Sequence, residues 1–171
     1  MRIGKVEGGY TLVELIIVVA IIGVLLGIAG ISSVTYHDRY SAEAQVRRMH
    51  IDMMQARGKA FLQNRTCFVT VTPGSYQITE DTNDSGGAAP DSGDTTLWPE
   101  PKRLTYRSNW AGTVILSGKG TISKSGGGIF SSNPVSIRFD TADAEPQYDC
   151  ISVGPTRINV GKWSGTKCAP I

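Results

Sequence analysis

The chain contains one long apolar stretch near its start, GGYTLVELIIVVAIIGVLLGIAGI, which covers residues 8–31. Glu14 is its only charged residue, and every residue from Leu15 to Ile31 is apolar or Gly. The run approaches the roughly 20 residues that a helix needs to cross the hydrocarbon core of a bilayer. Arg2 and Lys5 precede it, and a positive flank favours retention in the cytoplasm. The sequence therefore predicts a single-pass anchor with the rest of the chain exported.

Two ordinary export signals explain this stretch less well. The apolar core of a secretory signal peptide usually has about 7–15 residues and is followed by a small-residue cleavage site, and no clear A-x-A follows here. A plain signal anchor fits the hydropathy but leaves Glu14 unexplained, because a charged side chain deep in a bilayer costs on the order of 3 kcal/mol or more. We therefore expect Glu14 to have a local partner or a cationic one.

Thr11 and Glu14 have the S/T-x-x-E spacing of a capping box. In that motif the hydroxyl accepts a hydrogen bond from the amide of Glu14, and the carboxylate accepts one from the amide of Thr11. A second role is compatible with the first. A free amino group on Tyr10 would add a positive charge at the helix start, which the carboxylate of a neighbouring copy could neutralise. Such an amine exists only if the chain is cut after Gly9.

The leader MRIGKVEGG, the Gly9–Tyr10 junction, the TLVEL that follows and the aliphatic helix resemble the processing and assembly signal of type IV pilins and type II secretion pseudopilins. The resemblance implies that a prepilin peptidase cuts between Gly9 and Tyr10, that Tyr10 is then N-methylated, and that Glu14 guides subunits into a filament. Tyr10 departs from the more usual phenylalanine. The implied partners are the peptidase, an inner-membrane assembly platform and other subunits. The implied location is the bacterial inner membrane, with a periplasmic C-terminal domain, and then the filament.

The rest of the chain predicts one domain of ordinary size. The length of 171 residues allows a single core, and a net charge of +2 is too small to indicate nucleic-acid binding by itself. Over residues 36–63, apolar residues recur at three- and four-residue steps, which predicts a helix with one stripe facing a sheet. The residues of this stripe are Ala42, Val46, Met49, Met53, Ala56 and Ala60.

Short strand patterns replace the helical periodicity after Asn64. Pro73-Gly74 separates the first two and predicts a hairpin. The candidates are residues 67–71, 75–79, 112–117, 135–139, 150–153 and 157–161. We expect an α+β, type IV pilin-like fold, with a long N-terminal helix packed on an antiparallel sheet domain. The predicted parts are a cleaved leader (1–9), a transmembrane and filament-core helix (10–35), an amphipathic periplasmic half-helix (36–64) and a β-rich domain (65–171).

Residues 80–101 are poor in apolar side chains and rich in Asp, Gly, Ser and Pro, which predicts a flexible surface loop. Within it, Asp81, Asn83 and Ser85 have the spacing of the start of a calcium loop. The acid expected at the twelfth position is absent, because Ser92 stands there. A solvated loop is therefore the better account.

Three cysteines follow the anchor, and export would place them in an oxidising compartment, where three pairings are open. We favour Cys150 with Cys168, because this bridge would tie the last strands together and because C-terminal disulfides are common in pilin-like proteins. Cys67, in a predicted strand, would then be a buried free thiol or an alternative partner.

No residue pattern indicates catalysis, a cofactor or a metal centre. The sequence has no G-x-S-x-G, phosphate-cradling loop, paired-acid motif or C-x-x-C spacing. Its two histidines, His37 and His50, lie thirteen residues apart on the predicted helix, where surface positions explain them. We therefore expect a structural subunit and not an enzyme.

The tail YDCISVGPTRINVGKWSGTKC resembles the C-terminal region of the GspH/FimT family of minor pilins and pseudopilins. That resemblance implies a subunit of a tip or initiation complex. Some fimbrial members bind DNA through a Gly-Arg-x-Arg motif near this tail, and only Arg157 of that motif has a counterpart here. Lys162 and Lys167 are further candidate phosphate contacts. A DNA-binding minor pilin acting in DNA uptake is therefore the alternative to a purely structural subunit.

Overall fold

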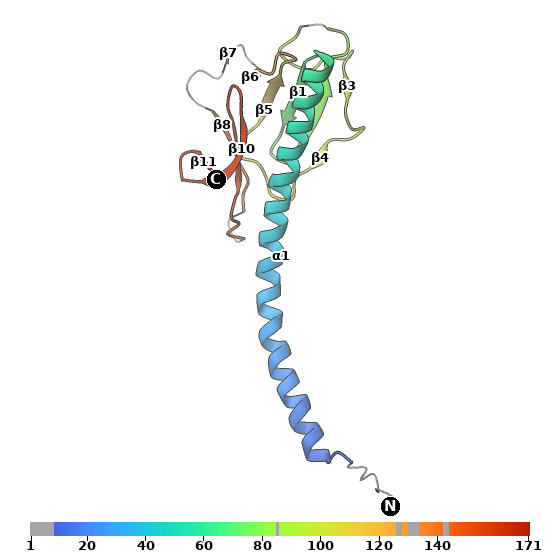
Figure 1. The fold of residues 1–171 in the computed structure, drawn as a ribbon, viewed down its shortest axis with the longest axis vertical. Coiled ribbons are helices and arrows are strands. Elements are labelled where there is room, and N and C mark those ends of the chain that lie inside the picture. The colour runs from blue at the N-terminus through green and yellow to red at the C-terminus, as the bar shows by residue number, and fades with distance from the viewer. Residues whose placement is uncertain (1–8, 85, 126–127, 130–133, 142–143) are drawn as a thin grey trace, which may run out of the picture. The chain divides into compact units, whose positions relative to one another are not determined.

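The computed structural model describes residues 9–84, 86–125, 128–129, 134–141 and 144–171. The first eight residues of the predicted leader and Ser85 of the calcium-like segment lie outside the described residues. The chain forms two compact units that divide between His37 and Asp38. The helix α1 (Leu12–Gln63) contributes residues to both units (Figure 1).

The helix ends at a residue suited to the left-handed conformation. Asn64 has a φ of 50°, and Asn is one of the few residues that adopt this region readily. The amide of Arg65 then donates to the carbonyl of Ala60 at 3.1 Å, which satisfies one of the last carbonyls of the helix. A Cβ at Gly118 would lie 2.7 Å from the carbonyl carbon of Asn64, so glycine at 118 permits a close approach to this cap.

The predicted apolar stripe of the helix is confirmed as its buried face. All six residues from Ala42 to Ala60 are at most 1% exposed. Five of them, all except Ala42, belong to one hydrophobic core together with residues of both sheets, including Val69, Ile78, Ile137 and Ile151. The helix is therefore part of the core of the second unit, and burial of its apolar face stabilises the fold.

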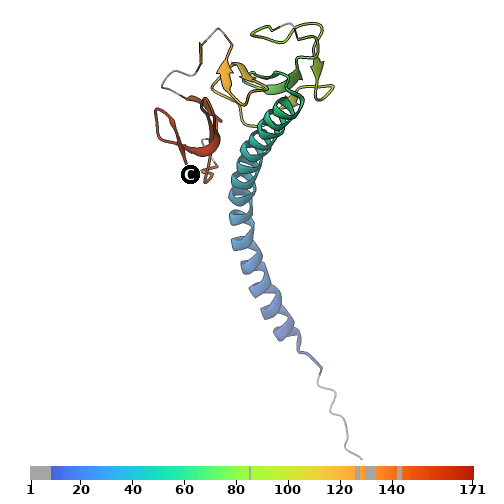
Figure 2. The ribbon, with the colours of Figure 1, turned by 45° about the horizontal axis from the view of Figure 1, so that its top comes forward.

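The strands form two antiparallel sheets (Figures 1 and 2). In the seven-stranded sheet the order is β3-β2-β1-β5-β6-β7, and β4 also pairs with β2. Its strands are β1 (Cys67–Val71), β2 (Ser75–Glu80), β3 (Thr95–Thr96), β4 (Lys102–Arg103), β5 (Gly112–Leu116), β6 (Ile122–Lys124) and β7 (Gly128–Ile129). The four-stranded sheet has the order β11-β10-β9-β8 and consists of β8 (Val135–Arg138), β9 (Cys150–Val153), β10 (Ile158–Trp163) and β11 (Cys168–Pro170).

Five of the strands in the described part of the chain were not predicted from the sequence. They are β3, β4, β6, β7 and β11, and none has more than three residues. Strands this short cannot show apolar alternation, and two of them, β3 and β4, lie within or directly after the segment 80–101 that we expected to be a loop. The predicted strand at 157–161 begins one residue later and continues to Trp163.

The loop 81–94, which connects β2 to β3, has no helix or strand among its described residues, but its polar side chains hydrogen-bond with one another. Asn83 Nδ2 and the amide of Gly93 both donate to Asp91 Oδ1, at 2.9 and 2.8 Å. The hydroxyl of Thr82 donates to the carbonyl of Gly93 at 2.8 Å. Asn83, one of the residues that suggested a calcium loop, thus serves the internal structure of this turn together with Asp91.

A buried carboxylate connects β2 to the last part of the helix. Glu80 is 5% exposed, with Oε2 2.6 Å from Lys59 Nζ and Oε1 3.3 Å from Arg65 Nη1. The hydrogen bond from Lys59, with that from Arg65, holds the pKa of Glu80 below its ordinary value, although burial acts in the opposite direction. Ionised Glu80 is therefore a stabilising contact.

Glu80→Gln is expected to lower the free energy of unfolding by about 1–2 kcal/mol, because it removes the charge that pairs with two cations. Since the folded pKa is depressed, the stabilisation is complete above the unfolded pKa of about 4.3 and is lost as the pH falls through the folded value. The variant should lose less stability on acidification than the wild type. Urea unfolding of the full chain in mild detergent, followed by tryptophan fluorescence, measures both effects.

Glu100→Gln is the matched control. Glu100 is exposed, and it has no hydrogen-bond or ion-pair partner among the described residues. An equal decrease in the free energy of unfolding for Glu80→Gln and Glu100→Gln would contradict the role assigned to Glu80.

Candidate processing and assembly site

The start of α1 is capped by Thr11. Its Oγ1 accepts a hydrogen bond from the amide of Glu14 at 3.2 Å, and its carbonyl accepts one from the amide of Leu15 at 3.2 Å. Thr11 thus occupies the cap position directly before Leu12, the first helical residue. One half of the predicted capping box is present in this geometry.

The carboxylate of Glu14 does not complete the other half. Among the described residues it has neither a hydrogen bond nor an ion pair, and its side chain is exposed. It lines a small hollow with Tyr10, Leu15 and Val18. Glu14 and Val18 are four residues apart and lie on one face of the helix start, and Tyr10, just before the helix, lines the same hollow. An acid with a satisfied amide and a free carboxylate, on an apolar face, is suited to a partner from outside the chain.

The apolar residues after Glu14 are exposed in the single chain. The large ones from Leu12 to Leu26 are between 49% and 75% exposed. Gly23 and Gly27 have no atom within 4 Å of an added Cβ, so their backbone is open to close approach. Such a surface requires an apolar environment or other apolar helices to cover it.

Among the described residues, no helix combines the length and the apolar character that crossing a membrane requires.

Cys150 and Cys168, the pair favoured from the sequence, form a disulfide with a Cα–Cα distance of 5.8 Å. The bridge joins β9 to β11, which are the two neighbours of β10. Gly161 on β10 makes room for this arrangement, since a Cβ there would lie 3.0 Å from Cys168 Sγ and 2.2 Å from the carbonyl oxygen of Ala169. Cys67 is a buried free thiol, and burial raises its pKa to about 11, which makes it unreactive at neutral pH.

Replacing Cys150 and Cys168 by Ser is expected to lower the free energy of unfolding by about 3 kcal/mol, as the 18-residue separation predicts. Urea unfolding with and without a reductant tests this, because reduction should bring the wild type close to the double variant and leave the variant unchanged. A wild type insensitive to complete reduction would contradict the prediction.

The candidate DNA contacts are not brought together by the fold. Lys162 Nζ donates to the carbonyl of Pro146 at 2.6 Å and lies 3.4 Å from Asp149 Oδ2, so its charge already has a partner. Arg157 precedes the six-residue strand β10 and Lys167 follows it, which separates their backbones by roughly 20 Å along the strand direction. These three cations do not form one phosphate-binding cluster.

The histidines have different surroundings. His37 is exposed, whereas His50 is half-buried, and its Nε2 lies 3.0 Å from the carbonyl oxygen of Ile158 on β10. His50 therefore joins the helix to the four-stranded sheet, a contact that the sequence spacing did not indicate. No group of three His, Cys, Asp or Glu side chains among the described residues is arranged to hold a metal ion.

The helix also carries a buried polar network that no sequence pattern predicts. Asp52 is 6% exposed and its Oδ2 accepts hydrogen bonds from Tyr76 Oη at 2.5 Å and from Lys102 Nζ at 2.7 Å. Burial, with the hydrogen bond to Asp52, raises the pKa of Tyr76 far above its ordinary value. Lys102 also lies 3.7 Å above the ring of Trp98. Asp52 lies next to the apolar stripe residue Met53, so periodicity alone does not reveal that it is buried.

One comparison with known proteins identifies the start of the chain. Residues 4–30 match the family model described as the prokaryotic N-terminal methylation motif. No curated protein and no solved structure shows a significant match. The match contains Gly9, Tyr10, Thr11 and Glu14, the residues whose geometry is given above. The chain thus carries the signature of type IV pilins and pseudopilins, and its fold, a long N-terminal helix packed on antiparallel sheets, is consistent with theirs.

Proposed function

We propose that the protein is a filament subunit that a prepilin peptidase cuts after Gly9. The new amino group of Tyr10 is methylated, and the subunit then enters a type IV pilus or a type II secretion pseudopilus. The match of residues 4–30 to the methylation motif carries this proposal. The carboxylate of Glu14, which has no partner among the described residues, supports it, because cleavage creates an amine that the carboxylate of a neighbouring subunit can pair with.

The parts of the chain have different roles in this proposal. Residues 10–35 anchor the precursor in the inner membrane and later form filament core, which covers the exposed apolar surface of the helix. Residues 36–64 are the periplasmic half of the helix, and residues 65–171 form the β-rich domain on the outside. The Arg2 and Lys5 flank supports an exported C-terminal domain.

A minor subunit of the GspH/FimT type is the more specific form of the proposal. It is supported by the tail, in which a Cys-containing strand and a final Cys are joined by a disulfide. Such a subunit acts at a tip or in an initiation complex. The role is structural and not enzymatic. The separation of Arg157 from Lys167 and the pairing of Lys162 give DNA binding no comparable support.

The mass of the mature protein from its native host tests the proposal. We expect a chain that begins at Tyr10 and is heavier by one methyl group. A product with the leader still attached, or one cut beyond the apolar stretch, would refute the assignment.

A further inference from the structure

A basic cleft lies between α1 and β4. It is a cavity of about 540 Å³, and its polar lining comes from Ser41, Gln45, Arg48, Tyr76, Lys102, Arg103 and Thr105. Two neighbouring segments thus contribute cations, Arg48 from the helix and Lys102 and Arg103 from the strand. No carboxylate is among the described residues that line it. The cleft therefore has the charge of an anion site.

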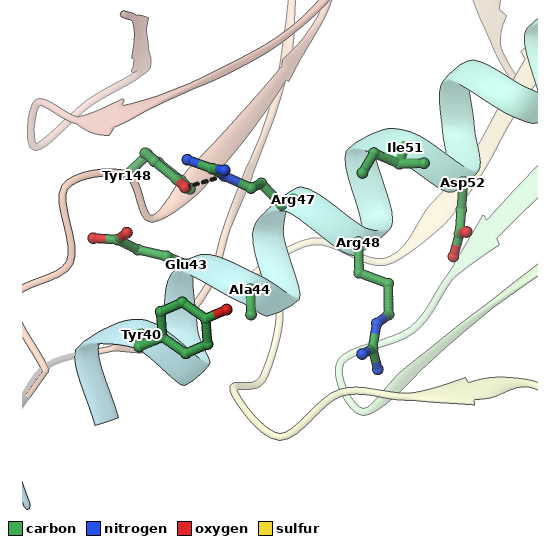
Figure 3. A pocket seen from close by; sticks show the side chains of 8 residues that line it. All are labelled: Tyr40, Glu43, Ala44, Arg47, Arg48, Ile51, Asp52 and Tyr148. Atoms are coloured by element: carbon green, nitrogen blue, oxygen red, sulfur yellow. Dashed lines mark hydrogen bonds between the residues drawn. The ribbon is translucent and has the colours of Figure 1, made fainter. Parts of the chain in front are cut away.

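Two of these three cations are available for a ligand. The charge of Lys102 is neutralised by Asp52, which lies behind it. Arg48 and Arg103 are exposed, and neither has a hydrogen bond or an ion pair among the described residues. Figure 3 shows the difference from the adjacent Arg47, which points to Tyr148 and hydrogen-bonds its hydroxyl, whereas Arg48 extends toward the yellow segment that carries β4. Two free guanidinium groups at one cleft suit carboxylates, which they bind in a bidentate manner.

The same chain offers a surface of the opposite charge. The loop 81–94, defined above, contains Asp81, Asp84, Asp91 and Asp94 and no Lys or Arg. Asp84 and Asp91 are exposed, as are Ala88 and Ala89 between them. Asp91 Oδ1 and Asp94 Oδ2 accept hydrogen bonds from backbone amides within the loop, and Asp81 is buried. The loop therefore offers the exposed carboxylate of Asp84, on an accessible tip that carries negative charge.

The acidic loop and the basic cleft lie at opposite ends of β2. The loop leaves from Glu80, and the amide of Asp81 donates to the carbonyl of Thr66, just beyond the helix end. β4 pairs with Ser75 and Tyr76 at the other end, roughly 17 Å away along the strand. Arg48 precedes the helix end by fifteen residues, which is about 22 Å along the axis. One copy therefore presents its acidic tip at one end of the second unit and its basic cleft toward the other.

We propose that the loop 81–94 of one copy docks into the Arg48–Lys102–Arg103 cleft of the next copy. The inference rests on the proposed function and adds to it a specific contact between subunits. Two different surfaces meet in this contact, so it is head-to-tail. Charge complementarity fixes the partner and its register.

Disulfide cross-linking between two tagged forms of the full chain tests the contact. The forms carry Ala88→Cys in the loop and Thr105→Cys in the cleft lining, and they are expressed together in bacterial membranes that contain a prepilin peptidase. We expect an oxidant to produce a mixed dimer. Adding Arg48→Glu and Arg103→Glu to the second form should lower the yield of the mixed dimer about tenfold, because the acidic loop would then face an acidic cleft. Asp84→Asn in the first form should also lower the yield of the mixed dimer.

The matched control replaces Thr105→Cys by Thr156→Cys, an exposed position on the turn before β10. The control pair should give no mixed dimer above background. In detergent extracts the yield should fall between about 0.1 M and about 1 M salt, as the Debye length shrinks from about 10 Å to about 3 Å. The buried thiol of Cys67 should resist alkylation in every variant, which verifies that each one is folded.

Equal cross-linking of the test and control pairs would overturn the contact, and so would a yield that the glutamate substitutions leave unchanged. The same gel reports removal of the leader. Cleaved subunits that do not cross-link would refute this contact alone, whereas uncleaved subunits would refute the proposed function.

Discussion

Gly9→Val is expected to leave the protein as an uncut precursor, with no detectable mature form. A Cβ at Gly9 would meet no atom within 4 Å, so the chain itself has room for a side chain there. The expected block therefore arises in the peptidase, which must accept the backbone on both sides of the Gly9–Tyr10 bond. Intact-mass measurement of the membrane fraction distinguishes the precursor from the product.

Gly58→Ala provides the control for this substitution. Gly58 also has open space at its Cβ position, but it lies far along the helix from the junction. This variant should be cut normally. A Gly9→Val protein with the wild-type mature mass would contradict the assigned cleavage point.

Glu14→Ala is expected to leave cleavage intact and to lower incorporation into filaments by about tenfold or more. The variant removes the carboxylate that would pair with the amino group of Tyr10 on a neighbouring subunit, and an unpaired ammonium in apolar surroundings costs several kcal/mol. The carboxylate has no partner among the described residues of its own chain, so its loss should not destabilise the monomer. The copy number of the variant in purified filaments, relative to its amount in the membrane, measures the effect.

Two further variants separate charge from helix capping. Glu14→Gln keeps the size of the side chain and the hydrogen bond from the backbone amide of residue 14 to Thr11 Oγ1, but it removes the charge. Its incorporation into filaments should be as low as that of Glu14→Ala. Thr11→Ala removes the cap, which is worth about 1 kcal/mol, and should assemble nearly normally. Normal incorporation of both Glu14 variants would exclude an electrostatic role for this residue.

The elements with strong periodicity were predictable from the sequence. The helical stripe from Ala42 to Ala60 repeats over five steps, and each strand of four or more residues was expected within two residues of its observed ends. The disulfide was predicted from the positions of Cys150 and Cys168 together with the resemblance to pilin-like proteins. The division into two sheets was not predictable, because strand pairing depends on contacts between residues far apart in the sequence, such as Cys67 with Leu116.

The polar contacts were the least predictable part. Tyr76 and Lys102 satisfy the buried carboxylate of Asp52, and Lys59 and Arg65 satisfy that of Glu80. No local sequence pattern predicts such partners. The basic cleft had one sequence signal, the pair Lys102-Arg103 directly after an acidic segment. Arg48 joins it only through the fold.

The position of the buried helical stripe also determines how the protein can be shortened for study in water. Ala42 is the first buried apolar residue among the described part of the helix, and the compact second unit begins at Asp38. A recombinant form that starts at Asp38 would lack the exposed apolar surface of residues 12–26 and would keep all six residues of the apolar stripe, from Ala42 to Ala60. One that starts after Met49 would lose three of them and leave a gap in the protein interior.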